Sequence, residues 1–361
     1  MTPGISQESA FPAPSVTDGW LGHTWRLVRW NLRLARRRLM SKILLGILLA
    51  GLLLVLGVLL LVVNTVSSIS SAEFSANCPS PVATSSTGDG SGTNAPCTPA
   101  STQNAQQQAQ SAKNSDLQLL SFPTILAPVG GYTSFMGTIL LCILAGTVIG
   151  SEYAYGTQRL ALSRGVSRAQ LLAGQVGTLA ILALAVAGFM LLLGALIGLA
   201  LGPALGASLP SLPASGLLQL VAFWLVLSLH LFAYALIALL LATLSSSTAV
   251  GIAGSLGYLI FESIALPIVV IIASALTGST VSNVFERLPA FFLGPNLDGL
   301  LNGVNQSPLD LGGGSSNSAG SGSAIVQGGI TPLQGLLVAL LYCIVLVGAS
   351  YWVLRKRDVT H

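Results

Sequence analysis

Six apolar stretches, each about 20 residues long or longer, dominate this chain of 361 residues. The hydrocarbon core of a bilayer is about 30 Å thick and an α-helix rises about 1.5 Å per residue, so each stretch can cross a membrane once. A membrane β-barrel is excluded because its strands alternate apolar and polar residues. The stretches are residues 43–63, 125–149, 171–201, 216–242, 249–276 and 331–354. We therefore predict an all-α polytopic membrane protein with six transmembrane helices.

The composition agrees with this class of protein. Only 7% of the residues are charged and 52% are hydrophobic, whereas a soluble domain has about 25% charged residues. The formal net charge of +4 is modest. It is explained by membrane topology, with some attraction to anionic lipid headgroups, and it gives no indication of a nucleic-acid partner.

The positions of Lys and Arg predict the orientation, because cytoplasmic segments near membrane-spanning helices have an excess of these residues. Thirteen of the fifteen lie before the first stretch, between the second and third, or after the sixth: Arg26, Arg29, Arg33, Arg36, Arg37, Arg38, Lys42, Arg159, Arg164, Arg168, Arg355, Lys356 and Arg357. The other two are Lys113 and Arg287. We therefore expect both termini in the cytoplasm and the chain in the plasma or inner membrane of a bacterial cell.

Residues 20–42 have the pattern of an amphipathic helix. Apolar residues recur there at spacings of four and three: Leu21, Trp25, Val28, Leu32, Ala35 and Leu39. Arginines border this stripe, so we expect the helix to lie in the headgroup plane of the membrane with its Trp and Leu side chains buried. It is either a positive-inside anchor or a lever that also contacts a cytoplasmic partner. The apolar run that follows is too long for a typical cleavable signal peptide.

The remaining segments are two tails and two outer connections. Residues 1–19 and 355–361 are predicted cytoplasmic tails, the first of them disordered, on either side of a six-span domain at 43–354. Segment 64–122 is poor in apolar residues, so we expect a flexible outer loop. Segment 277–330 begins with a mildly apolar piece that we expect to pack on the helices, and it ends in a Gly/Ser linker.

The four cysteines divide by compartment. Cys78 and Cys97 fall in the first outer loop, where oxidation is allowed, and we predict a disulfide between them. Two separate free thiols are the alternative. Cys142 and Cys343 lie inside apolar stretches, where cysteine usually acts as a small hydrophobic residue.

The segment between the second and third stretches, residues 150–170, is a polar hairpin. Thr157 is a suitable N-cap for a short helix over 158–164, and Gly165 suits the left-handed conformation that ends a helix. Ser167 and Gln170 then form a capping box for the next span. We expect a short surface helix between two spans.

This hairpin resembles the inner loop of type-2 permease subunits of ATP-binding-cassette (ABC) exporters. The resemblance rests on Glu152-Tyr-x-x-Gly-Thr157, then Arg159, then Leu-Ser-Arg164-Gly-x-Ser-Arg168, and on the order of the six spans and their connections. In that family the hairpin is a coupling helix that docks on a separate ATPase subunit. The residues that match the pattern are Glu152, Tyr153, Gly156, Thr157, Arg159, Arg164, Gly165 and Arg168. The chain differs at Gly165, where the family commonly has proline, and at Gln175, where it commonly has lysine.

The chain contains no Gly-x-x-x-x-Gly-Lys-Ser/Thr phosphate loop. We therefore expect no cofactor on this chain and no enzymatic activity of its own, with ATP and Mg²⁺ bound by the ATPase partner. The resemblance implies two permease copies with two ATPases. Six helices are few for an enclosed pathway, which also favours a dimer. Glycines spaced for close helix contact occur at Gly194, Gly198, Gly202, Gly251, Gly254 and Gly257, within or between subunits.

Two ionisable residues, His230 and Glu262, lie deep in predicted spans, where charge is costly and usually has a partner or a function. Both are about equally far from the turn between the fourth and fifth spans, so we expect them at similar depth. They either form a structural group or line a substrate path. Trp224 is a further candidate for contact with an apolar substrate, although core or lipid packing is the commoner role of such a residue.

Three function classes follow. The favoured class is the permease subunit of an ABC exporter that moves an amphipathic or hydrophobic substrate out of the cytoplasm or the inner leaflet. The alternatives are an ion-coupled secondary transporter that uses Glu262 and His230 as a proton relay, and a membrane scaffold or sensor without transport. The sequence shows no catalytic triad, no metal cluster and no paired catalytic carboxylates.

Overall fold

The computed structural model describes residues 20–37, 39–77, 122–156, 163, 165–204, 214–276, 288–306 and 332–356. Several sequence predictions lie outside these residues. They concern the short helix at 158–164 with Thr157, Arg159 and Arg164, and the disulfide between Cys78 and Cys97.

Every regular element in the described part of the chain is helical, which confirms an all-α polytopic fold. The α-helices are α1 (Trp20–Arg37), α2 (Leu39–Asn77), α4 (Leu126–Tyr132), α5 (Thr138–Ala154), α7 (Arg168–Ala204), α8 (Ala214–Ser245), α9 (Thr248–Ile260), α10 (Leu266–Leu276), α12 (Leu293–Gln306) and α13 (Pro332–Lys356). Two π-helical turns, η1 (Thr133–Gly137) and η2 (Phe261–Ala265), join α4 to α5 and α9 to α10, and a 3-10 turn, η3 (Leu288–Phe291), precedes α12.

Five helical spans in the described residues are long and apolar enough to cross a membrane. They coincide with the second to sixth predicted stretches. The first predicted stretch lies in α2, whose apolar part, Lys42–Val58, is shorter, so the number six stays a prediction. Helix α2 also continues to Asn77, past the predicted end of the span at residue 63, since no proline interrupts it before Pro79.

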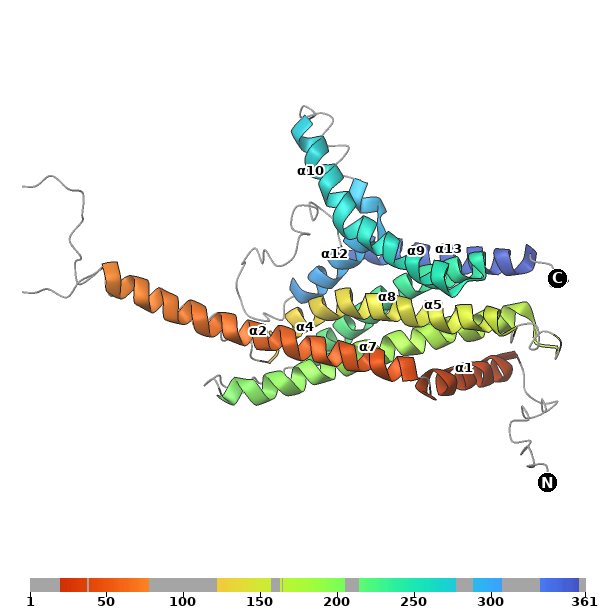
Figure 1. The fold of residues 1–361 in the computed structure, drawn as a ribbon, viewed down its shortest axis with the longest axis horizontal. Coiled ribbons are helices and arrows are strands. Elements are labelled where there is room, and N and C mark those ends of the chain that lie inside the picture. Colours follow the sequence, from red (N-terminus) through yellow and green to blue (C-terminus); the bar gives the residue numbers. More distant parts are fainter. Residues whose placement is uncertain are drawn as a thin grey trace, which may run out of the picture.

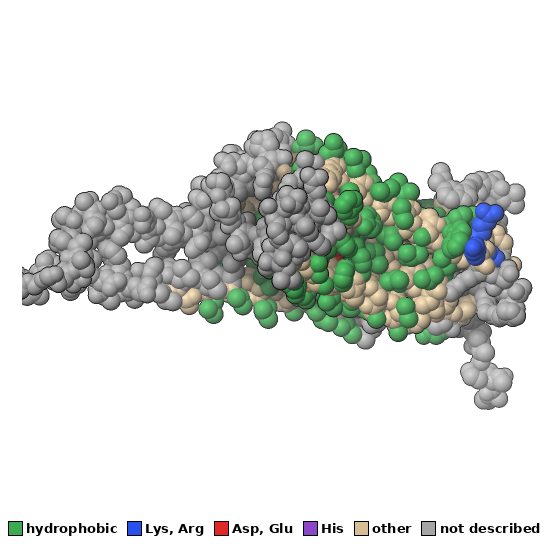
Figure 2. Space-filling view, turned by 90° about the horizontal axis from the view of Figure 1, so that it is seen from above, with side chains coloured by type: hydrophobic (Ala, Val, Ile, Leu, Met, Phe, Trp, Pro, Cys, Tyr) green, Lys and Arg blue, Asp and Glu red, His purple; other side chains and the backbone are tan. Residues whose placement is uncertain are grey.

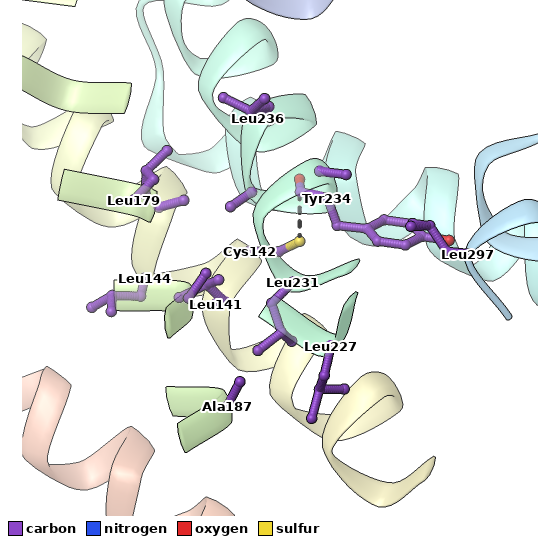
Figure 3. Close-up of a cluster of buried hydrophobic side chains, with 14 of the residues drawn as sticks. Leu141, Cys142, Leu144, Leu179, Ala187, Leu227, Leu231, Tyr234, Leu236 and Leu297 are labelled. Carbon is purple, nitrogen blue, oxygen red and sulfur yellow. Dashed lines mark hydrogen bonds between the residues drawn. The ribbon is translucent and has the colours of Figure 1, made fainter. Parts of the chain in front are cut away.

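Helix α8 is the centre of the bundle. It packs against α5, α7, α9, α12 and α13, and its middle is buried almost all round, from Leu227 to Ala242. Figure 3 shows leucines of α5, α7 and α8 around Cys142, whose Sγ lies 3.6 Å from the Tyr234 carbonyl oxygen. The Tyr234 ring points the other way, toward Leu297 of α12. A helix that is apolar on all sides is typical of such a central position.

One end of the bundle gathers the features predicted to be cytoplasmic. Helix α1, the end of α5, the start of α7 and the last turn of α13 all lie there (Figure 1). Figure 2 shows Lys and Arg side chains at the same end, whereas hydrophobic side chains cover much of the rest of the described surface in that view. This distribution is the one expected for a helix bundle in lipid with a cationic face.

The spaced glycines Gly194 and Gly198 of α7 lie against another segment of the same chain. A Cβ on Gly194 would lie 3.0 Å from both methyl carbons of Val129, and one on Gly198 would lie 2.7 Å from the Ile125 side chain. These glycines therefore admit the α4 segment against α7. In α9, Gly251 is similarly close to Ala242 of α8.

Helices α5 and α9 approach each other closely at Gly150. A Cβ there would lie 2.5 Å from the Thr248 Cα and 2.7 Å from its backbone nitrogen. We predict that Gly150→Ala forces the two helices apart and lowers the free energy of unfolding by about 1–3 kcal/mol, the usual cost of overpacking. Thermal unfolding of the detergent-solubilised protein measures the loss. The control is Gly257→Ala on α9, where no atom lies within 4 Å of the added Cβ; equal stability of the two variants would contradict the prediction.

Candidate functional site

The inner loop is entered and left through glycines with left-handed backbone. Gly156, just after α5, has φ +65°, and Gly165, just before α7, has φ +85°, a conformation in which glycine is unstrained. The predicted capping box is confirmed: the Ser167 amide donates to Gln170 Oε1 at 3.0 Å, and the Gln170 amide donates to Ser167 Oγ at 3.3 Å. These contacts fix the direction in which the chain enters α7.

Glu152 and Gln175 join the two helices at the base of the loop. Gln175 Nε2 donates a hydrogen bond of 2.5 Å to Glu152 Oε2, which connects the last turn of α5 with α7. Gln175 is only 2% exposed, and its Oε1 has no hydrogen-bond partner in the described structure. The Glu152 contact is thus the one shown to satisfy this buried amide. Tyr153, beside Glu152, is half-buried and packs against the hydrophobic core.

Arg168 binds the end of another span. Its Nη1 donates to the carbonyl oxygens of Leu354 and Arg355, each at 2.9 Å. Both carbonyls belong to the last turn of α13, where a helix has no backbone donors left to satisfy them. The positive charge also suits the negative end of the helix dipole. Arg168 is therefore a cap on the C-terminus of α13.

Helix α1 packs on α7 as well as facing outward. Cβ atoms on Gly174 and Gly177 of α7 would lie 3.1 Å and 3.0 Å from Leu27 and Val28, so α1 approaches closely there. Val28, part of the predicted apolar stripe, is buried, but Trp25 of the same stripe is 54% exposed. The stripe thus faces α7 in part and the outside in part.

The second site is a buried group of polar side chains around Glu262, which is 4% exposed. Its Oε2 accepts 2.7 Å from the Tyr234 hydroxyl, and its Oε1 accepts from the Tyr258 hydroxyl at 3.4 Å and from the Gly294 amide at 2.5 Å. An ionised carboxylate suits these three donors because it only accepts hydrogen bonds. Gly294 lies in the first turn of α12, so the carboxylate also caps the positive end of that helix.

His230 and Glu262 do not touch directly but share Tyr234 as a neighbour. The His230 and Tyr234 rings lie 5.2 Å apart, centroid to centroid, and the Tyr234 hydroxyl continues to Glu262. His230 is 5% exposed, and its Nδ1 has no partner among the described residues. Trp224 lies apart from this group: its indole nitrogen donates 3.0 Å to the Leu184 carbonyl, which ties α8 to α7.

One family model matches the chain from residue 35 to residue 359, and its description is ABC-2 family transporter protein. The chain belongs to the ABC-2 transporter family. It is accordingly a multi-pass permease subunit, a component that is generally not catalytic by itself and normally works with ABC ATPase subunits. No curated protein and no solved structure matches the chain.

Sequence reasoning missed several partners in this ABC-2 permease. The predicted residues Glu152, Arg168 and Glu262 find their partners at Gln175, at the α13 carbonyls and at Gly294. Gln175 follows the capping box at the start of α7, so it was recognisable in the sequence as a polar residue near the end of a span. Backbone groups carry no sequence signature, so the others could not be found. In the described part of the chain, no group of three or more His, Cys, Asp or Glu side chains could hold a metal ion.

A first prediction concerns the base of the inner loop. Glu152→Ala removes the acceptor of the Gln175 amide and leaves this buried side chain without the hydrogen bond that Glu152 provides. We expect the free energy of unfolding to fall by about 1–3 kcal/mol, the cost of an unsatisfied buried polar group. Glu152→Ala combined with Gln175→Leu should regain most of the loss, and thermal unfolding of all three proteins tests this. A double variant no more stable than the single one would contradict the assignment.

A second prediction concerns Glu262. Glu262→Ala leaves the buried Gly294 amide without its acceptor, so we expect a loss of about 1–3 kcal/mol in unfolding free energy. Glu262→Gln keeps one accepting oxygen and should lose less. Ser263→Ala is the matched control, because Ser263 is exposed and its hydroxyl bonds to Leu259 in its own helix. Stability is measured by urea or thermal unfolding. If Ser263→Ala proves less stable than Glu262→Ala, Glu262 does not support α12.

Proposed function

We propose that this chain is the membrane-spanning subunit of an ABC exporter and that its inner loop couples the helices to a separate ATPase. The main support is the construction of the loop in a member of the ABC-2 family. Glycines bound it, the Glu152 contact closes its base, and the described helix ends that flank it lie at the end of the bundle where Lys and Arg side chains are seen (Figures 1 and 2). A loop built on such fixed helix ends transmits an applied force to the spans instead of absorbing it. Of the matching residues, Thr157, Arg159 and Arg164 remain the candidates for direct contact with the ATPase.

We infer an assembly of two permease copies and two ATPases, in which the ATPases bind ATP and Mg²⁺. Large apolar side chains on α9, η2, α10 and α13 are exposed in the single chain. These faces contact lipid or the second copy. Closure of the ATPases would then move both inner loops and rock the helices between inward-open and outward-open states.

The substrate that suits such a bundle is amphipathic or hydrophobic, taken from the cytoplasm or the inner leaflet. The spans are apolar along most of their length, and the group of His230, Tyr234 and Glu262 supplies a few polar contacts at depth. A pathway with few polar groups does not compensate the desolvation of a multiply charged solute. Trp224 has a donor role in helix packing, so we place it beside the path and not in it.

Family membership favours ATP-driven transport over the two alternatives, an ion-coupled carrier and a scaffold or sensor. The cheapest discriminating observation is the energy source. Transport by an exporter stops when ATP hydrolysis is blocked by vanadate, whereas transport by an ion-coupled carrier stops when the proton gradient is collapsed with ATP still present.

We predict that reversing two charges of the loop, Arg159→Glu with Arg164→Glu, weakens association with the ATPase about tenfold or more, because the introduced carboxylates repel the acidic groups that the two arginines would contact. The measurement is co-purification of the ATPase with the tagged chain, with titration of the purified partners. Lys113→Glu is the control, because it changes one charge in a segment predicted to lie on the other side of the membrane. Association and substrate movement that both survive the double reversal would refute the proposed coupling.

A further inference from the structure

Arg168 is one of the residues that match the coupling-helix pattern, but the structure gives its side chain a partner inside the chain. Both hydrogen bonds of Nη1 go to the last turn of α13, 186 and 187 residues away in sequence. The backbone of Arg168 is also held, because it lies between the residues of the capping box at Ser167 and Gln170. The side chain therefore links the exit of the inner loop to the C-terminal end of the last span.

The other end of α13 is in close contact with α12. A Cβ on Gly335 of α13 would lie 2.4 Å from the Asn296 carbonyl oxygen, and one on Gly303 of α12 would lie 2.4 Å from the Pro332 ring. The Tyr342 hydroxyl adds a hydrogen bond of 2.8 Å to the Phe291 carbonyl, just before α12. Because a helix packed so closely cannot slide far without a clash, we expect α12 and α13 to move together.

The N-terminal end of helix α12 in turn contacts Glu262. The Gly294 amide at its start donates to the Glu262 carboxylate, which also binds Tyr234 and Tyr258. Two helices thus connect the inner loop with the buried polar group, and each has a charged side chain of another helix at its free end. Arg168 holds the C-terminus of α13, and Glu262 holds the N-terminus of α12.

We propose that Arg168 is a positioning residue that transmits movement of the inner loop to α13, and that α13 and α12 together transmit it to the Glu262 group. The inference rests on the proposed function, in which an ATPase moves the loop. It assigns Arg168 a different part in that function from docking: its contact is with α13, not with the ATPase. Displacement of α12 would change the donors around Glu262 when the partner binds ATP.

The test compares Arg168→Gln, Arg168→Lys and wild type in nanodiscs, each bound to the ABC ATPase that co-purifies with the tagged wild-type chain. Amide hydrogen exchange in α12 is measured with and without ATP plus vanadate. In wild type we expect ATP to change the exchange in α12. In Arg168→Gln the complex should form equally well, but the response of α12 should be about fivefold smaller or absent, a typical size for a lost coupling. Arg168→Lys keeps a charged donor and should restore most of the response.

Arg355→Gln is the matched control, because it removes one charge from the same exposed end of α13 while the carbonyl contacts of Arg168 remain. A second variant, Gly335→Ala, breaks the path at the α12 contact and should also reduce the response while the ATPase still binds. Gly348→Ala is its control, since no atom lies within 4 Å of the added Cβ. The second pair keeps the test decisive if Arg168→Gln does not fold.

The outcomes separate the two proposals. If no ABC ATPase binds the wild-type chain, the proposed function fails. If it binds, but Arg168→Gln or Gly335→Ala leaves the ATP response of α12 unchanged, the transmission path is refuted. If Arg168→Gln instead abolishes ATPase binding while Arg355→Gln does not, Arg168 is a docking residue and the inference is overturned.

Discussion

The ends of helices are the weak points of a helix bundle, because the last carbonyls and the first amides have no partner within their own helix. This chain satisfies two such ends with charged side chains from other helices. Arg168 binds the C-terminal carbonyls of α13, and Glu262 accepts from an N-terminal amide of α12. In each case the side chain has the opposite charge to the helix end that it binds, so the hydrogen bond and the electrostatic interaction stabilise the same arrangement. The other contacts between these helices are mostly apolar and have no direction of their own.

The helices of such a bundle differ in how firmly they are linked to their neighbours. Apolar contacts in lipid are not strongly specific, since lipid tails solvate a leucine about as well as another leucine does. The directional links between helices are therefore the ones that decide which elements move together. Among them are the links of α5 to α7 at Glu152, of α7 to α13 at Arg168, of α8 to α7 at Trp224, and of η2 to α12 and α8 at Glu262. Helix α10, after the π-helical turn η2, leaves the bundle in Figure 1 and has exposed apolar side chains, so it is the part of the fifth span least tied to the others.

Features set by local chemistry could be predicted from the sequence. The positions of five spans followed from their length and apolar character, and the left-handed Gly165 and the capping box at Ser167 followed from short-range preferences. Contacts between distant segments could not be predicted, because a backbone carbonyl of Leu354 or an amide of Gly294 looks like any other in a sequence. The equal distance of His230 and Glu262 from a turn predicted their similar depth, but it did not predict Tyr234 between them, whose position depends on how α8 packs against η2. Hydropathy predicted a first span that ends at residue 63, whereas the helix α2 continues to Asn77, because hydropathy marks where lipid ends and a helix continues until its backbone is interrupted.

The contact of Arg168 with α13 also bears on which residues of the inner loop would contact an ATPase in the proposed coupling. A guanidinium group that supplies the capping donor for α13 would lose those hydrogen bonds if it turned toward a partner, and the carbonyls of Leu354 and Arg355 would lose their donor. That cost opposes docking through Arg168. Glu152 is likewise bound by Gln175 at the base of the loop, where a lysine would form an ion pair and glutamine donates a hydrogen bond from an uncharged amide. Of the residues that match the coupling pattern, Glu152 and Arg168 thus have partners within the chain at the ends of the loop, and the proposed coupling assigns contact with the ATPase to Thr157, Arg159 and Arg164.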